Sequence, residues 1–230
     1  MYATTTSEST LNTAMAKVYG TMGLGLLITF LISFFIGTEP GLVKSIFESG
    51  LKWPILLAPL GIILVMSFCR DKLSVLSLKA LFTVFAVLEG VSLSVIFVVY
   101  TQSSIAATLL IASLMFGVMS AYGYFTKKDL TSWGNLLFFT LIGLLIAMIV
   151  NMFLRNSMMQ MVISFIGVIL FMGFIAYDSQ KIREALWGST DTEREVIMGA
   201  VTLYLDMLNL ILFLLRLIGV QVPGLSLIHI

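Results

Sequence analysis

Long uncharged runs of apolar residues, separated by short polar segments, make up most of this chain. Runs without any charged residue cover 18–38, 53–69, 130–154 and 156–177, while 80–126 contains one charge, Glu89, and 196–215 also contains one, Asp206. A membrane-spanning helix needs ~20 apolar residues. The long run at 80–126 must therefore cross a membrane twice, and the polar residues at 100–104 mark the break within it.

These runs predict helices rather than strands, because they are continuous instead of alternating. The predicted helices cover 16–37, 53–69, 78–100, 105–126, 132–154, 158–185 and 194–217. The run after Lys17 is longer than the apolar core of a secretory signal, so we expect a first membrane helix there and no cleaved leader. The fold class is therefore an all-α integral membrane protein, a seven-transmembrane helix bundle.

The expected domain organisation is simple. A polar cytoplasmic N-terminus covers 1–15, a single membrane domain covers 16–219, and a short tail covers 220–230. The tail could be a non-native extension, so it carries no weight in the fold prediction.

The composition agrees with a lipid environment and excludes several functions. Hydrophobic residues make up 59% and charged residues 11% of the chain, whereas globular proteins carry about 25% charged residues. The net charge of +1, with no basic block, argues against nucleic-acid binding. With Cys69 as the only cysteine, neither an internal disulfide nor a Cys/His metal cluster can form. No nucleophile lies beside a base, so we expect neither catalysis nor a cofactor.

The distribution of lysine and arginine predicts the orientation, since these residues gather on the cytoplasmic side. With the N-terminus inside, the inner side holds Lys17, Arg70, Lys72, Lys79, Lys127, Lys128, Lys181, Arg183 and Arg194. The outer side holds only Lys44, Lys52, Arg155 and Arg216. The N-terminus is therefore expected in the cytoplasm.

Two acidic residues in the last two predicted helices are the main functional signal. Asp178 and Asp206 both lie in apolar runs, where an ionised carboxylate costs at least ~2.5 kcal/mol. Asp206 is flanked by Leu205 and Met207, so we expect it to face inward with a partner or a proton. Asp178 precedes polar residues and could instead reach the membrane interface.

The connection between these helices predicts a hairpin. Gly188 is a plausible C-cap, and the sequence TDTE at 190–193 fits a capping box. By a rise of ~1.5 Å per residue, Asp178 lies about 15 Å from one end of the loop and Asp206 about 24 Å from the other, a difference of about 9 Å. Helix tilt could remove that difference, so the spacing permits a carboxylate pair without requiring one.

Other polar residues near these acids are candidates for supporting roles. Asn209 shares a helix face with Asp206 and could donate a hydrogen bond to it, while Tyr204 is interpreted as an interfacial or packing residue. Glu89 is a third buried acid, either a neutral hydrogen-bonded residue or part of an ion pathway. Arg70 and Lys72 are the cations on the expected cytoplasmic side that could neutralise one of these acids.

The last two helices resemble the signature of the transmembrane Bax-inhibitor-motif family. The segments GFIAYDSQKI and LYLDMLNLILFLLRLIG carry this resemblance, and SLMFGVMSAYGYFTKKDL is similar to the bacterial branch of the family. The resemblance runs over 19–219. It implies seven helices with the last one surrounded by the other six, a place in the bacterial inner membrane, and a pH-sensitive calcium leak.

The resemblance also implies roles for individual residues. The two sensor aspartates of the family match Asp178 and Asp206, and a basic residue after the second helix matches either Arg70 or Lys72. An acid that the family carries inside the second helix is absent from 53–69. Glu89 is the candidate that could serve in its place.

The sequence hypothesis is therefore a calcium leak controlled by a carboxylate pair. Two carboxylates close together in a low dielectric cannot both ionise cheaply, so they would share one proton and hold the two helices together. Asp178 and Asp206 alone cannot supply the 6–8 oxygens that calcium prefers, so they would bind it only weakly. Expected partners are the lipid bilayer, calcium and protons.

Two other classes of function stay open from the sequence. One is a non-conducting membrane regulator, for instance of a membrane protease or a stress response, which would show no flux when purified. The other is a proton-coupled transporter that uses the same acids as a relay and requires an organic substrate.

Overall fold

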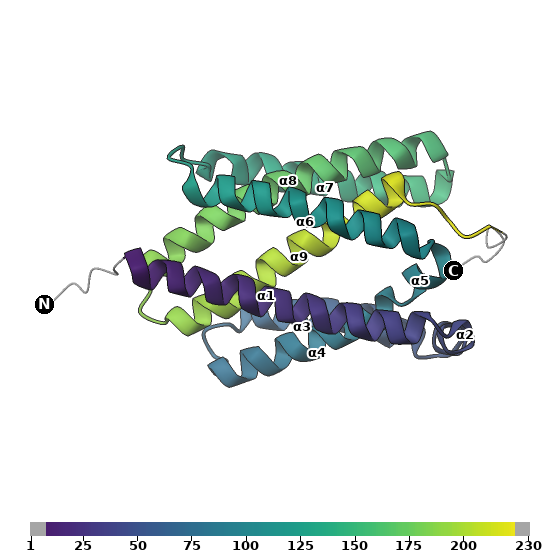
Figure 1. Cartoon of the computed structure of the whole chain (residues 1–230), viewed down its shortest axis with the longest axis horizontal. Helices are drawn as coiled ribbons and strands as arrows, with labels where there is room; N and C mark the ends of the chain where they lie inside the picture. Colours follow the sequence, from purple (N-terminus) through teal and green to yellow (C-terminus); the bar gives the residue numbers. More distant parts are fainter. Residues whose placement is uncertain (1–7, 224–230) are drawn as a thin grey trace, which may run out of the picture.

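The computed structural model describes residues 8–223, and these form an all-helical bundle (Figure 1). The helices are α1 (Glu8–Gly37), α2 (Pro40–Glu48), α3 (Lys52–Phe68), α4 (Val75–Leu93), α5 (Val95–Val99), α6 (Gln102–Phe125), α7 (Thr131–Leu154), α8 (Ser157–Trp187) and α9 (Thr192–Ile218). Long helices follow from the continuous apolar runs, because each backbone group must be paired within the lipid.

The number of membrane spans agrees with the sequence prediction. Within the described residues, six spans are long and apolar enough to cross a membrane, with α4 and α5 forming one of them, and a seventh arises if α2 and α3 count together. Each predicted segment coincides with a span or with α3. The prediction of an all-α membrane bundle is confirmed, and the seven predicted spans correspond to these six plus the α2–α3 pair.

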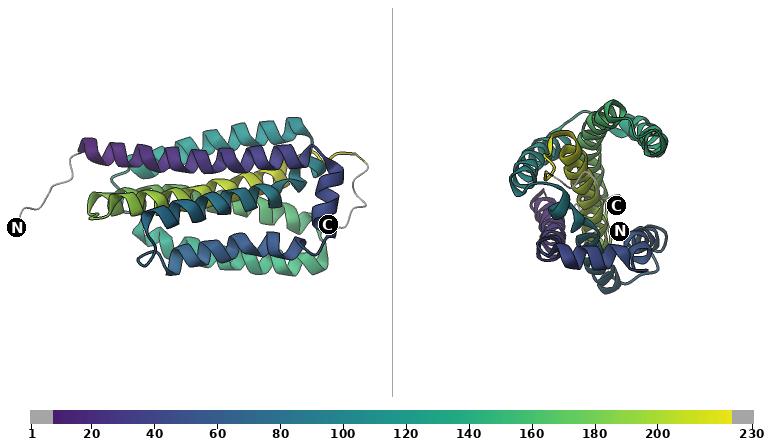
Figure 2. Two further views of the ribbon diagram at one scale, coloured as in Figure 1. Left: turned by 90° about the horizontal axis from the view of Figure 1, so that it is seen from below. Right: turned by 90° about the vertical axis from the view of Figure 1, so that its right-hand side faces the viewer.

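The short helix α2 was not predicted. It bends by 82° from α3 and lies across the end of the bundle (Figure 2). Its N-terminus carries Pro40, a residue suited to a first helical turn. Val43 is buried, while Lys44 and Glu48 pair on the surface at 3.9 Å. The helix is therefore amphipathic, but nine residues are too few to span a membrane.

The ends of several elements also differ from the prediction. α1 begins at Glu8, so half of the predicted polar N-terminus is helical, and α8 continues to Trp187. Residues 220–222 of the predicted tail pair with the α5–α6 connection, where the Thr101 amide donates to the Val220 carbonyl at 3.0 Å. The rest of the predicted tail, 224–230, lies outside the described residues.

The last helix forms the centre of the bundle. Two thirds (67%) of its apolar window is buried, against 17–39% for the other spans. It packs against α1, α4, α6 and α8, while α3 packs on α4 and α7 on α8. Figure 2 shows the other helices arranged around it. The expected central position of the last helix is confirmed, and α3 and α7 form an outer layer around its neighbours.

One glycine allows α6 and α8 to approach each other closely beside the central helix. A Cβ atom at Gly123 of α6 would collide with the backbone of Ala176 in α8. Small residues of this kind allow membrane helices to pack backbone to backbone. The contact fixes α8 against α6 two residues before Asp178.

Candidate functional site

Asp178 and Asp206 face each other across the interface of α8 and α9. These helices are antiparallel neighbours joined by a short loop, and Asp191 caps α9 by accepting from the Arg194 amide at 3.2 Å. Asp206 is 6% exposed and Asp178 is partly buried. The two carboxyl groups are close enough to interact directly with each other. The oblique path of α9 through the bundle (Figure 1) reduces the height difference expected from the residue count.

One oxygen of this pair has no partner. Asp206 Oδ2 is buried and makes no hydrogen bond within residues 8–223. Most buried side-chain polar atoms in proteins have at least one hydrogen-bond partner. The pair therefore offers a free acceptor inside the bundle, which suits a proton or a cation.

Lys181 is a cation that acts on Asp178, and the sequence analysis did not select it for this role. It lies one turn after Asp178 on α8 and interacts electrostatically with that carboxyl group. Its Nζ also lies 5.6 Å from the ring centroid of Tyr177. The spacing of three residues on one helix could have identified it.

The proposed counter-charges, Arg70 and Lys72, lie elsewhere. Arg70 forms an ion pair with Glu195 in the first turns of α9, and it also lies 3.5 Å from Asp71. Lys72 is exposed. Glu195 precedes Asp206 by eleven residues, about 16 Å along a helix. The structure therefore does not bring either cation to the carboxylate pair; Arg70 ties the α3–α4 loop to the end of α9.

A second cation strengthens this connection between the α3–α4 loop and α9. The Arg194 guanidinium donates to the Leu73 carbonyl at 2.8 Å and also to the Arg70 carbonyl. Lys79 pairs with Glu193 at 3.2 Å. Positive residues of the α3–α4 region thus pair with acidic residues in the first turn of α9, and these acidic residues also interact favourably with the helix dipole.

The other two candidate residues lie apart from the pair. The Asn209 side chain donates to the Leu205 carbonyl of its own helix at 2.8 Å, so it does not support Asp206 as expected. Glu89 is partly buried in α4 and has no hydrogen bond or ion pair in the described part of the chain; its electrostatic neighbour is Tyr204. Glu89 therefore belongs to the α1–α4–α9 contact rather than to the carboxylate pair.

Tyr204 itself is fully buried, so the interfacial interpretation was wrong and the packing interpretation was right. Its hydroxyl lies 2.6 Å from Thr29 Oγ1, which donates to the Ala86 carbonyl at 2.8 Å. Its ring makes edge contacts with Phe82 and Phe85. This network joins α1, α4 and α9, and Tyr204 precedes Asp206 by two residues, about half a helical turn.

A second hydroxyl network lies beside Asp178. Tyr19 Oη lies 2.7 Å from Ser120 Oγ, which lies 2.9 Å from Ser179 Oγ. Gln180 accepts from the Leu130 amide at 2.8 Å and so holds the α6–α7 loop against α8. The residues after Asp178 are thus used for packing between helices. Sequence reasoning missed these networks because their members are separated by 50 or more residues.

The site has few ligands for a metal ion. No group of three or more His, Cys, Asp or Glu side chains occurs in the part of the chain that the structure describes. Asp178 and Asp206 supply at most four oxygens, fewer than the 6–8 that calcium prefers. Water and backbone carbonyls would have to complete a calcium shell, which fits weak binding.

The chain is similar to known membrane proteins over nearly its whole length. Residues 11–222 match the family model described as "Inhibitor of apoptosis-promoting Bax1". The inner membrane protein YbhL of Escherichia coli is 39% identical over 215 residues, covering 91% of this chain and 92% of that protein. An uncharacterized protein of Rickettsia prowazekii, RP147, is 42% identical over 218 residues, covering 93% and 92%.

Proposed function

Because the chain belongs to the family of inhibitors of apoptosis-promoting Bax1, we propose that it is a pH-sensitive calcium leak channel controlled by Asp178 and Asp206. The protein is embedded in the membrane, and its Escherichia coli relative is an inner membrane protein. We place this chain in the inner membrane as well. Calcium is the transported ion, and the lipid bilayer is the solvent of the helices.

The observation that carries the proposal is the contact between two carboxyl groups inside the bundle. Asp178 and Asp206 come from neighbouring antiparallel helices, and Asp206 Oδ2 has no hydrogen-bond partner among residues 8–223. Two carboxylates close together in a low dielectric cannot both carry a charge cheaply. One shared proton would remove the repulsion and hold α8 against α9.

Loss of that proton would leave two like charges facing each other. A calcium ion could relieve this repulsion, and Lys181 could relieve part of it from one side. Proton occupancy would therefore set how tightly α8 and α9 are held and whether calcium can enter. The sparse ligand set favours passage over storage, because tight calcium sites use more oxygens.

Calcium flux into liposomes that contain the purified protein tests this proposal. Flux is measured over a pH series for the wild type, Asp178→Asn and Asp206→Asn, since asparagine keeps the size of the side chain and removes its titration. Asp129→Asn is the matched control, because Asp129 lies in a loop and accepts a local bond from the Thr131 amide at 2.8 Å. We expect pH-dependent flux for the wild type and the control, and flux without that pH dependence for the other two.

Each contrary outcome points to a different conclusion. Unchanged pH dependence in both Asp178→Asn and Asp206→Asn would overturn the carboxylate mechanism. Absence of flux from the purified wild type at every pH would overturn the channel and favour a non-conducting regulator. Flux that requires an added organic substrate would identify a proton-coupled transporter.

A further inference from the structure

A cavity of about 420 Å³ opens between α1 and α6 in the half of the bundle remote from the cytoplasmic end. Both helices pack against α9, yet they scarcely touch each other, and α9 is visible between them in Figure 1. Their direct contacts lie in the cytoplasmic half, where Tyr19 meets Ser120 and Phe116, and Tyr124 meets Asn12. The outer halves of α1 and α6 therefore stand apart.

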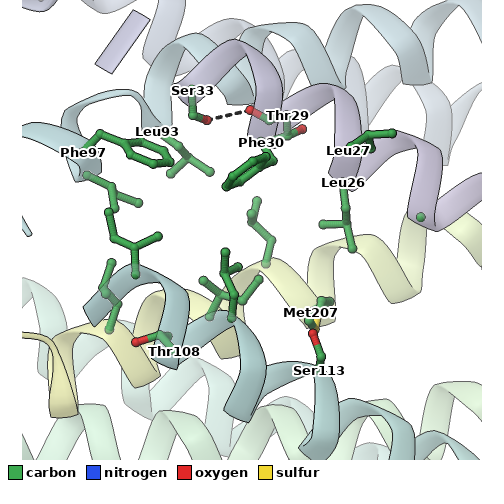
Figure 3. Close-up of a pocket in the computed structure, with 17 residues that line it drawn as sticks. Leu26, Leu27, Thr29, Phe30, Ser33, Leu93, Phe97, Thr108, Ser113 and Met207 are labelled. Atoms are coloured by element: carbon green, nitrogen blue, oxygen red, sulfur yellow. Dashed lines mark hydrogen bonds between the residues drawn. The ribbon is translucent and has the colours of Figure 1, made fainter. Parts of the chain in front are cut away.

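The cavity wall is mainly apolar (Figure 3). Leucine, isoleucine, phenylalanine and methionine side chains come from α1, α4, α5, α6 and α9. The polar groups of α1 in this wall are already used: Thr29 donates to the Ala86 carbonyl and Ser33 donates to the Thr29 carbonyl at 2.6 Å. Thr108 Oγ1 is the one buried hydroxyl of the wall without a partner among the described residues.

Water is a poor occupant of such a space. A buried water typically makes two to four hydrogen bonds, and the wall, within residues 8–223, offers only the Thr108 hydroxyl inside and the Ser113 hydroxyl at the mouth. An apolar cavity of about 150 Å³ stays dry and binds small apolar molecules. At about 420 Å³ this mainly apolar cavity is larger than that, so an apolar occupant is expected.

The mouth of the cavity is continuous with the surface that the protein presents to lipid. Leu27 and Phe30 line the cavity and are also 51% and 39% exposed. Leu24 and Leu110, next to the mouth on α1 and α6, are 64% and 63% exposed. In a membrane protein these side chains face hydrocarbon. The apolar molecule present at the mouth is therefore a lipid acyl chain.

We propose that one acyl chain of a bilayer phospholipid enters between α1 and α6 and fills this cavity. The chain would reach the floor formed by Met207 and Leu208 of α9, which are only 5% and 7% exposed. It would separate α1 from α6 and contact the central helix next to Asp206. Lipid binding at this site is independent of calcium conduction, so its test does not depend on flux.

Two glycines of α1 allow a matched test of occupancy. A Cβ atom at Gly23 or Gly20 would meet nothing within 4 Å, but only Gly23 lines the cavity. Gly23→Phe should fill the mouth, whereas Gly20→Phe adds the same ring outside it. Ser113→Phe narrows the mouth from α6 and serves as a second variant.

The first measurement is native mass spectrometry of protein extracted from dioleoylphosphatidylglycerol vesicles. The wild type and Gly20→Phe should retain one phospholipid. Gly23→Phe and Ser113→Phe should lower the lipid-bound fraction by roughly tenfold, the effect of about two buried methylene groups. Equal retention in all four proteins, or none in the wild type, would overturn the proposal.

The second measurement locates the chain directly. A phospholipid with a photoreactive diazirine in its acyl chain is crosslinked to the wild type in the same vesicles. We expect crosslinks on Met207 or Leu208, which lipid outside the cavity cannot reach, and their loss in Gly23→Phe. Crosslinks confined to exposed residues such as Leu24 and Leu110 would show that the cavity holds something else and would refute the assignment.

Discussion

Replacing Tyr204 by Phe removes one hydroxyl from the buried contact between α1, α4 and α9. The ring keeps its contacts with Phe82 and Phe85, whose centroids lie 5.5 and 5.4 Å away. The 2.6 Å hydrogen bond to Thr29 is lost, but Thr29 still donates to the Ala86 carbonyl. The substitution therefore isolates one hydrogen bond without changing the packing.

The comparison with Thr29→Val gives the expected magnitudes. A hydrogen bond between membrane helices contributes about 0.6 kcal/mol on average and at most about 1.7, so Tyr204→Phe should lower the free energy of unfolding by roughly 0.5–1.5 kcal/mol. Thr29→Val removes both bonds and leaves the Tyr204 hydroxyl buried without a partner, which costs about 1–3 kcal/mol in addition. The double variant has no unpaired hydroxyl, so its loss should be smaller than the sum of the two.

Reversible unfolding by dodecyl sulfate in mixed micelles measures these free energies, and the three variants with the wild type form a double-mutant cycle. The reasoning requires Thr29→Val to be more harmful than Tyr204→Phe and the pair to be coupled. Additive losses would refute the hydrogen bond. A larger loss from Tyr204→Phe than from Thr29→Val would show that the ring, not the hydroxyl, had been disturbed.

Two further changes test the helix contacts. Gly123→Ala should lower the free energy of unfolding by about 1–3 kcal/mol, because the new methyl group meets the Ala176 backbone. Gly117→Ala, on the same helix with open space around it, is the control and should be neutral. Equal shifts of the melting temperature in detergent for the two variants would contradict this prediction. Hydrogen bonds from the Arg194 side chain and backbone hold the pKa of Asp191 below its ordinary value. The ionised Asp191 therefore stabilises the fold at pH values above its pKa in the unfolded chain. This contribution is lost as the pH falls through the pKa of Asp191 in the folded protein. The melting temperature of Asp191→Asn should therefore lie below that of the wild type near neutral pH and meet it below roughly pH 4, whereas a difference that persists in acid would exclude the charge.

The sequence predicted most of the fold because the membrane restricts the alternatives. Apolar runs of known length can only be helices, and one charge in a run of twice the normal length requires two crossings. The amphipathic helix α2 escaped prediction because its nine residues include Lys44 and Glu48 and are too few for a membrane span. The central position of α9 was predicted from the family resemblance rather than from the hydrophobic pattern.

The candidate site was predicted only in part. Asp206 was identified by the cost of a charge in lipid, which depends on the local sequence alone. Arg70 was chosen because it is expected on the same side of the membrane as Asp206. In the structure it pairs with Glu195, which lies eleven residues before Asp206 on α9. The partners of Tyr204 and Ser179 come from helices distant in the sequence, so no local pattern could reveal them.

The central position of α9 has a consequence for biogenesis. In the chain, α1, α4, α6 and α8 all precede the helix against which they pack. When these helices enter the membrane, the groove that will receive α9 has no protein to fill it, and Thr29 and Asp178 lack their partners on α9, Tyr204 and Asp206. Lipid or an insertion factor must occupy that groove until α9 arrives. Assembly of the bundle is therefore completed by its last helix, and a chain released before Thr192 has inserted helices but lacks the most buried part of the core.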